Sequence, residues 1–462
     1  MKTKRIFFGL LVLSLLSCNY LNQMIVTPTI TPLPPTLTAT ASLTPTPEPL
    51  KPSFIPSECV DKPIATVAPV DAADAQATPA TPVSPEISKD EQLMVFNELV
   101  TRINEVYVYP DFNGKDWNEI QSRYEAKINA GLDTEAFYFE MDSMIYELGD
   151  DHSFYLSPAE VEQTEERLSG DVEFVGVGIY GQTEYERGRH IVISTFPGSS
   201  ADNGGIQAHD AILQVDGLPI EEDSGFRLRG PECSAVVMTV QSPGEAPRDV
   251  MLVRHNLQGS LNIDARLVAT TDGSKIGYIF IPTFFDETIP PQIDAALEEF
   301  GDLDGLILDV RLNGGGISSV TDLIFAHFVS GRLGQFVSRE GSYPLRVEAD
   351  PIANSQTVPL VVIVSEDTAS YGEIFAGVLK DQGRAKITGE TSLGNVEVLY
   401  GSTFEDGSEA WIASAIFRPK NSDADWEQTG IVTDISAFAE WDTFTFETDP
   451  SIAAALTLLG HQ

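Results

Sequence analysis

A serine near the end of the sequence is well placed for nucleophilic chemistry. Ser370 follows the apolar run in LVVIVSEDTAS and precedes the helical pattern YGEIFAGVLKDQG. A serine at the amino end of a helix can attack a carbonyl carbon, because the free N–H groups and partial positive charge there stabilise a developing oxyanion. Serine at such a position is more often only a helix cap, so Ser370 alone does not decide the function.

A glycine cluster supplies the second feature. In DVRLNGGGISS, glycines separate the apolar run GLILDV from a helical pattern. Glycines between a strand and a helix allow backbone N–H groups to approach a substrate closely. Taken with Ser370, the cluster makes a catalytic site the stronger interpretation.

Both features lie in a region of alternating strands and helices that begins near Leu261. KIGYIFIPTF, GLILDVRL, PLVVIVSE and AKITGE are typical of strands, and helical patterns separate them. Nearly continuous apolar strands between helices predict an α/β core.

The preceding region, from Val172, predicts short strands interrupted by glycines. VEFVGVGIYG, HIVISTF and GSSADNGGIQAHDAILQVDG resemble a PDZ domain over nearly its full length. The resemblance implies that Gly176, Val177, Gly178 and Ile179 receive a peptide carboxylate beside a strand edge that pairs with an extended peptide. The alternative is a domain that serves only as a spacer.

Residues 88–169 predict a small helical domain, because Glu91–Val106, Asn118–Asn129 and Phe137–Leu148 carry apolar residues at helical spacing. Residues 18–87 before it are rich in Pro, Thr, Ala and Ser. Such a composition cannot build a core and predicts an extended stalk.

The start of the chain indicates export. Basic residues precede the short apolar run Ile6–Leu16, which is too short for a membrane span and predicts a signal peptide over residues 1–17. The following LLSC resembles the lipobox of bacterial lipoproteins, which implies a lipid on Cys18. We therefore expect a membrane-anchored lipoprotein at the cell surface or in the periplasm. An ordinary secretory signal is the alternative.

Charge and cysteine content limit the partners. The formal charge is −41, from 28 basic and 69 acidic residues, so the chain should repel nucleic acid and anionic headgroups. Export would permit a disulfide between Cys59 and Cys233. Cys59 lies in the expected stalk, however, and two separate thiols agree with the sequence equally well. The cysteines form no metal-binding pattern.

DVRLNGGG and PLVVIVSEDTASYGEIFAGVLKDQGRAKITGETSLG together resemble the carboxy-terminal-processing peptidase and tricorn protease family. With the PDZ match, the resemblance extends from about residue 90 to the end. It implies a multidomain α+β protein with a helical cap, a β-barrel-like PDZ domain at residues 170–258 and a ClpP/crotonase-like α/β peptidase core at residues 259–462. It makes Ser370 the nucleophile and assigns the oxyanion hole to Gly315 and Tyr371, with no metal or organic cofactor.

The sequence departs from the family at the general base. Many members place a lysine where this chain has Asn395, and Leu399 replaces the usual glutamine. Asparagine cannot accept the serine proton, and Lys380 and Lys386 fall out of register.

The tricorn-like branch has an Asp-x-His-Ser/Thr segment that ELGDDHSFYLSP resembles. It implies that His152, followed by Ser153, is the base, since histidine transfers protons near neutral pH. The alternative is a structural histidine at a helix end. Of the other histidines, His190 and His209 fall in the PDZ region and are expected at its surface.

A third group should orient the histidine. Glu427 in DWEQTGIVTD lies where the tricorn-like branch keeps an acidic residue, although Thr433 replaces the family's proline. Asp150 and Asp151 are the alternatives.

These observations predict an exported, lipid-anchored serine peptidase that acts through an acyl-enzyme. Its partners would be protein or peptide substrates, captured through their carboxyl termini. A catalytically inactive peptide-binding scaffold remains open because the lysine is missing. So does a binder of small hydrophobic ligands, although no residue singles it out.

Overall fold

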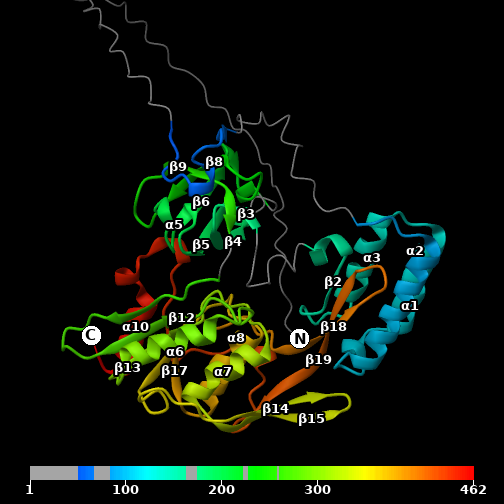
Figure 1. Ribbon diagram of the computed structural model, residues 1–462. Coiled ribbons are helices and arrows are strands. Elements are labelled where there is room, and N and C mark those ends of the chain that lie inside the picture. Colours follow the sequence, from blue (N-terminus) through cyan, green and yellow to red (C-terminus); the bar gives the residue numbers. More distant parts are fainter. Residues whose placement is uncertain (1–49, 67–83, 163–173, 222–226, 258–259, 462) are drawn as a thin grey trace, which may run out of the picture. The chain divides into compact units, whose positions relative to one another are not determined.

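The computed structural model describes residues 50–66, 84–162, 174–221, 227–257 and 260–461 (Figure 1). The expected signal peptide, Cys18 and most of the expected stalk lie outside these residues. Within the described ranges, no helix is both long and apolar enough to cross a membrane.

Three helices follow the expected stalk: α1 (Lys89–Val106), α2 (Trp117–Ala130) and α3 (Thr134–Tyr146). Each begins where a side chain accepts a hydrogen bond from the first turn, and Ser88 forms a capping box with Glu91. Their apolar faces pack on one another and against Ala410, Ile412 and Ala413 of strand β19 (Glu409–Pro419). The core of this helical region is therefore completed by the C-terminal part of the chain.

We call residues 174–257 the middle domain, which is mainly β-sheet (Figure 1). Its elements are β3 (Phe174–Gly176), β4 (Ile179–Glu184), β5 (Arg189–Thr195), α5 (Ser200–Asn203), β6 (Ala211–Val215), β7 (Leu218–Pro219), β8 (Ser234–Gln241), β9 (Arg248–Val253) and β10 (His255–Leu257). The main sheet runs β1-β8-β6-β5-β4, where β1 (Ala65–Thr66) comes from before the helical region; β7 pairs with β6, β9 with β8, and β3 with β10. In the described part of the chain, β4 is an edge strand of the sheet.

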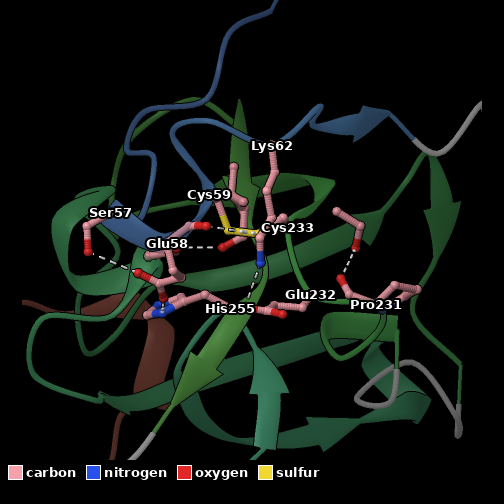
Figure 2. The surroundings of a disulfide bond; sticks show 11 residues. Ser57, Glu58, Cys59, Lys62, Pro231, Glu232, Cys233 and His255 are labelled. Carbon is pink, nitrogen blue, oxygen red and sulfur yellow. Dashed lines mark hydrogen bonds and ion pairs between the residues drawn. A yellow bond between two sulfur atoms is a disulfide. The ribbon is translucent and has the colours of Figure 1, made fainter.

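Residues 50–66 fold onto the middle domain, although they fall in the region expected to be stalk. Figure 2 shows the disulfide between Cys59 and Cys233 that holds them there. Strand β1 (Ala65–Thr66) pairs with β8, and Glu58 Oε1 lies 2.9 Å from His255 Nδ1. The prediction of a stalk over the whole of residues 18–87 is therefore wrong for this segment. The composition of residues 50–66 did not indicate folding, because a disulfide supplies stability that the few apolar residues of the segment cannot.

The C-terminal core contains a six-stranded sheet in the order β11-β12-β13-β16-β17-β20, parallel from β12 onward. These strands are β11 (Ala265–Val268), β12 (Ile276–Phe280), β13 (Gly305–Asp309), β16 (Leu360–Val364), β17 (Ala385–Gly389) and β20 (Ile435–Ser436). Its helices are α6 (Ile289–Phe300), α7 (Ser318–Phe328), α8 (Tyr371–Asp381), α9 (Trp426–Thr429) and α10 (Pro450–Leu459).

Both faces of this sheet are covered, which explains the continuous apolar strands. Leu306 and Leu308 pack in one cluster with α6, α7 and α8, while Ile307 between them packs in another with α10. All five residues of β13 and of β16 are buried. The core is therefore the α/β structure that the strand and helix pattern predicts.

A second sheet connects this core to the N-terminal helices. It runs β15-β14-β19-β18, with β14 (Gly331–Ser338), β15 (Gly341–Val347) and β18 (Glu397–Thr403). Strand β2 (Phe154–Leu156), which follows α3, pairs with β19. This pairing brings the loop before β2 into the C-terminal part of the molecule.

The middle domain contacts the core through the segment around Trp441. Ile191 and Ile193 of β5 share an apolar cluster with the core strands, and the Trp441 indole N–H donates to the Val192 carbonyl at 2.9 Å. His209 Nδ1 lies 2.8 Å from the Trp441 carbonyl oxygen. The expectation that His190 and His209 are surface residues is wrong, because His190 is buried and His209 lies half-buried at this junction.

Candidate active site

Ser370 occupies a sharp turn between β16 and α8. Its backbone has φ 52° and ψ −125°, a conformation that non-glycine residues rarely adopt. Its N–H donates to the Asn395 carbonyl at 2.7 Å. A strained strand-to-helix turn of this kind presents the serine hydroxyl outward at the start of a helix, as nucleophile elbows do.

The glycine cluster packs directly against this turn. A Cβ on Gly315, where φ is 101°, would lie 2.8 Å from Ser370 Cβ and 3.0 Å from the Tyr371 nitrogen. A Cβ on Gly316 would lie 2.1 Å from the Phe284 carbonyl carbon. No side chain fits at either position, so the glycines are required for the close approach of the two loops.

Ser370, Gly315 and Tyr371, which the sequence predicted to act together, are thus adjacent. The Tyr371 N–H is the first amide of α8, and such amides have no acceptor within their own helix. The Gly315 N–H donates to Asn313 Oδ1 at 2.9 Å. It must exchange this partner for a substrate oxygen if it is to stabilise an oxyanion.

Residues 392–395 form a second loop beside Ser370. Glu373, one helical turn after Ser370, is buried and accepts hydrogen bonds from Ser392 Oγ, the Gly394 N–H and the Asn395 N–H at 2.5, 2.7 and 2.7 Å. Burial raises the pKa of the Glu373 carboxyl. The Asn395 side-chain oxygen is buried and has no hydrogen-bond partner. Asn395, which stands where many family members have a lysine, therefore lies beside the candidate nucleophile.

His152 lies in the loop between α3 and β2, and Asp150 shapes that loop. Asp150 Oδ1 accepts hydrogen bonds from the His152 N–H at 2.9 Å and the Ser153 N–H at 2.7 Å. Ser153 Oγ donates to Asp150 Oδ2 at 2.8 Å and accepts from the Ala413 N–H at 2.9 Å. Ser153 and Asp150 therefore anchor the loop to β19. A direct catalytic role for Ser153 stays a prediction.

Glu397 at the start of β18 is the carboxylate beside the histidine ring. Its Oε2 atom lies 3.7 Å from His152 Nδ1, and the two side chains are 1% and 12% exposed. Tyr109 donates to Glu397 Oε1 at 2.6 Å. Glu397 could not be predicted from the sequence, because one glutamate in GNVEVLYG looks like any exposed residue of a strand.

Glu427, which was predicted to support the histidine, contacts Glu397 instead. The two carboxyl groups are within hydrogen-bonding reach of each other, and Glu427 Oε2 accepts from the Val396 N–H at 2.8 Å. The structure therefore places Glu427 beside Glu397, and a role for Glu427 in supporting the histidine stays a prediction. The folding of β18 inserts Glu397 between Glu427 and the imidazole.

The two carboxyl groups have opposite protonation tendencies. Burial, a hydrogen bond with Glu397 and the charge of Glu397 raise the pKa of Glu427 well above its usual range. Burial also raises the pKa of Glu397, but the neighbouring His152, Glu427 and Tyr109 side chains outweigh it and leave that pKa lowered. Two carboxylates in contact cannot both ionise easily, which is why the pKa of Glu427 rises beside a charged Glu397.

The predicted peptide-binding residues form the turn between β3 and β4. Gly176 ends β3, Val177 is buried in the middle domain, and the Gly178 carbonyl accepts from the Phe196 N–H at 3.0 Å. Ile179 begins the edge strand β4. These residues are distant in sequence from Ser370 and belong to a separate candidate site.

A cavity of about 370 Å³ lies between β4 and the loop after β16. Its lining includes Thr183, Arg187, Asp367 and Trp441 but neither Ser370 nor His152. The cavity is therefore not the site that Ser370 and His152 form. Among the described residues, no cluster of His, Cys, Asp and Glu has the arrangement to hold a metal ion.

Comparison with known proteins agrees with this arrangement. The profile of peptidase family S41 matches residues 275–437, and that of the tricorn protease C1 domain matches residues 88–143. A carboxyl-terminal-processing protease of Picosynechococcus is 30% identical over 373 residues, covering 77% of this chain and 86% of the relative. One from Synechocystis is 29% identical over 374 residues, covering 77% and 84%.

A solved structure agrees as well. The photosystem II D1 C-terminal processing protease has a TM-score of 0.53 and 25% identity, covering 75% of this chain and 92% of that protein. The chain is thus a serine-type peptidase with a multidomain α+β fold. It belongs to peptidase family S41, the carboxyl-terminal-processing peptidases, which confirms the family inferred from the sequence.

Proposed function

We propose that this peptidase hydrolyses peptide bonds through an acyl-enzyme formed on Ser370, with His152 as the general base. His152 Nε2 accepts the Ser370 Oγ proton as the oxygen attacks the peptide carbonyl. The Tyr371 and Gly315 N–H groups stabilise the oxyanion. The C–N bond breaks as His152 returns the proton to the leaving amine, and water then releases the acyl group by the same steps.

One observation carries this proposal: the strained Ser370 and the His152–Glu397 pair border the same short segment. The Ser370 N–H donates a hydrogen bond to the Asn395 carbonyl. Glu397, two residues after Asn395, faces His152 Nδ1. Glu373, one turn along α8 from Ser370, is also within electrostatic range of His152. With Nδ1 directed at a carboxylate, the Nε2 atom is left for the serine, as the reaction requires.

We also propose that the middle domain is a PDZ domain that captures the carboxyl termini of substrate proteins. The turn at residues 176–179 leads into the edge strand β4, and an extended peptide can pair with such an edge. The names of the relatives, carboxyl-terminal-processing proteases, support cleavage near protein carboxyl termini.

A third proposal concerns location: the enzyme is exported and anchored to a membrane by lipid on Cys18. Support comes from the lipobox-like sequence and from the Cys59–Cys233 disulfide, since such bonds persist in oxidising compartments. Metabolic labelling with a fatty acid should mark the wild-type protein in bacterial cells but not Cys18→Ser. Unlabelled wild-type protein with both remaining thiols reduced would contradict the proposal.

The experiment for the catalytic proposal compares the full-length protein with Ser370→Ala, His152→Ala and Asn395→Ala on an unfolded protein substrate. The first two should lose about 10⁴-fold or more in kcat/KM, because nucleophile and base act as a unit. Asn395→Ala should keep cleavage, because the amide of Asn395 cannot accept the serine proton and so is not the base. If wild type cleaves nothing and also resists a fluorophosphonate probe, the protein binds peptides without hydrolysing them.

A further inference from the structure

The acidic group around His152 contains more than a peptidase of the serine–histidine type needs. Glu397, Glu427 and Glu373 come from three different elements, β18, α9 and α8, and all surround one imidazole or its immediate neighbour. Among the described residues, Tyr109 contacts Glu397, Tyr107 lies near Asp150 and Glu397, and Asp150 lies in the histidine's own loop. Only one carboxylate can orient the ring.

We propose that Glu397 is the positioning residue of His152, and that Glu427 acts behind it as a protonated partner that donates to Glu397. The inference rests on the proposed Ser370–His152 mechanism and assigns the group that controls its base.

The positions of the His152 and Glu397 side chains support this assignment. His152 Nδ1 and Glu397 Oε2 are both buried, and neither has a hydrogen-bond partner at their separation of 3.7 Å. Buried polar atoms without partners are costly, and the two can satisfy each other if the ring moves by about 1 Å. Catalytic hydrogen bonds are often long before substrate binds and shorten in the complex. Glu397 is therefore poised to hold the Nδ1–H tautomer and leave Nε2 for Ser370.

The directions of the hydrogen bonds made by Glu397 and Glu427 also support it. Glu397 Oε1 already accepts the Tyr109 hydroxyl at 2.6 Å, and its Oε2 atom faces His152, so it must act as an acceptor on both sides. Glu427 Oε2 accepts a hydrogen bond from the Val396 N–H at 2.8 Å. A proton on Glu427 converts the clash of two carboxylates into a hydrogen bond. The raised pKa of Glu427 and the lowered pKa of Glu397 agree with this order.

The two glutamates should consequently respond differently to the same substitution. In Glu397→Gln the amide oxygen stays with Tyr109, so its NH₂ faces His152 Nδ1 and favours the wrong tautomer. In Glu427→Gln the amide oxygen can keep the Val396 N–H while its NH₂ donates to Glu397, as a protonated carboxyl would.

The test uses the full-length protein and steady-state kinetics across pH. Glu397→Gln should lose about 10²–10⁴-fold in kcat/KM, as when the orienting carboxylate of a triad becomes an amide. The acid limb of its pH profile should also move to lower pH, because the carboxylate beside the His152 ring is lost. Glu427→Gln should lose about tenfold at most, since one neutral donor replaces another. Glu397→Asp, which keeps a carboxylate, should recover part of the activity.

Glu405→Gln is the matched control, since Glu405 is exposed on the turn that connects β18 to β19. It should behave as wild type in every assay. Thermal unfolding of each variant excludes a loss of fold as the cause. A folded Glu397→Gln with wild-type kcat/KM and an unmoved acid limb would overturn the proposal, as would a larger loss in Glu427→Gln.

A readout that needs no turnover separates this inference from the catalytic proposal. The Cε1 resonance of His152, assigned by its absence in His152→Gln, should change at lower pH in Glu397→Gln than in wild type. If wild type hydrolyses no peptide but this shift occurs, Glu397 still controls the histidine and only the catalytic proposal fails. If hydrolysis occurs without the shift, the assignment of Glu397 fails alone.

Discussion

The Ser370 turn and the His152 surroundings solve the same problem, the placement of one reactive atom, by different means. The turn is held mainly by backbone: Ser370 is in a strained conformation, Gly315 packs against it, and the Ser370 N–H donates to the Asn395 carbonyl. The histidine is held by side chains from several elements, with Glu397, Glu427 and Tyr109 forming one network. The Ser370 turn should therefore be sensitive to any added side-chain atom. The surroundings of His152 should instead be sensitive to the protonation of the side chains that hold it.

Glu373 joins the two regions. Its carboxylate fixes the Gly394 and Asn395 amides, the Asn395 carbonyl binds the Ser370 N–H, and the same segment continues into Glu397. A change in either region is therefore transmitted to the other through residues 392–397. The following predictions separate the two.

Among these further variants, the largest effect on activity is expected from Gly315→Ala, which tests the backbone region. The new Cβ would lie 2.8 Å from Ser370 Cβ at a φ of 101°, so the loop must shift away from the nucleophile. Loss of a well-placed oxyanion donor costs about 10²–10³-fold in kcat. Gly314→Ala is the control, because a Cβ there meets no atom within 4 Å. Equal activities in both variants would show that the turn is not sterically closed.

A smaller effect is expected from Ser153→Ala, which tests the loop that carries His152. The substitution leaves the Ala413 N–H without its acceptor and removes a donor from Asp150. We expect the free energy of unfolding to fall by about 1–3 kcal/mol, measured by urea denaturation. Activity should fall with it if the loop positions the base. Ser402→Ala on β18 is the control, because that hydroxyl is buried without a partner and its removal should cost little.

The smallest effect concerns stability against pH. The pKa of Glu427 is raised in the folded protein above its ordinary value of 4.5, so its stabilising contribution is complete below that pH and is lost as the pH rises toward the folded pKa. Glu427→Gln has no such group. The free energy of unfolding should therefore decline less steeply above about pH 5 in this variant than in wild type. An identical slope, measured by denaturant titration at several pH values, would mean that Glu427 is ionised in the folded state.

The difference between the regions also explains which residues the sequence could identify. Ser370, Gly315 and Tyr371 lie in two contiguous motifs whose apolar strands, glycines and helical patterns are local. His152 and Glu427 could be proposed only through a resemblance, because no local pattern connects them to Ser370. Glu397 could not be proposed at all. Its role depends on the pairing of β2 and β18 with opposite edges of β19, which brings residues about 250 positions apart into contact.

The same limit applies to Cys59 and Cys233. The sequence permitted a disulfide but left separate thiols equally open, because the pairing closes a loop of 174 residues across the helical region. Composition indicated stalk for residues 50–66, and only the contact with the middle domain shows that they fold.

The sequence by itself determined the elements: strands, helices, the glycine turn and the serine at a helix start, all set by the periodicity and backbone preferences of neighbouring residues. Tertiary structure alone decided which carboxylate faces His152, which of the two carboxyl groups has the raised pKa, and that residues 50–66 are covalently bound to the middle domain. Those properties depend on burial and on distances between remote residues. A linear pattern of residue types does not contain them.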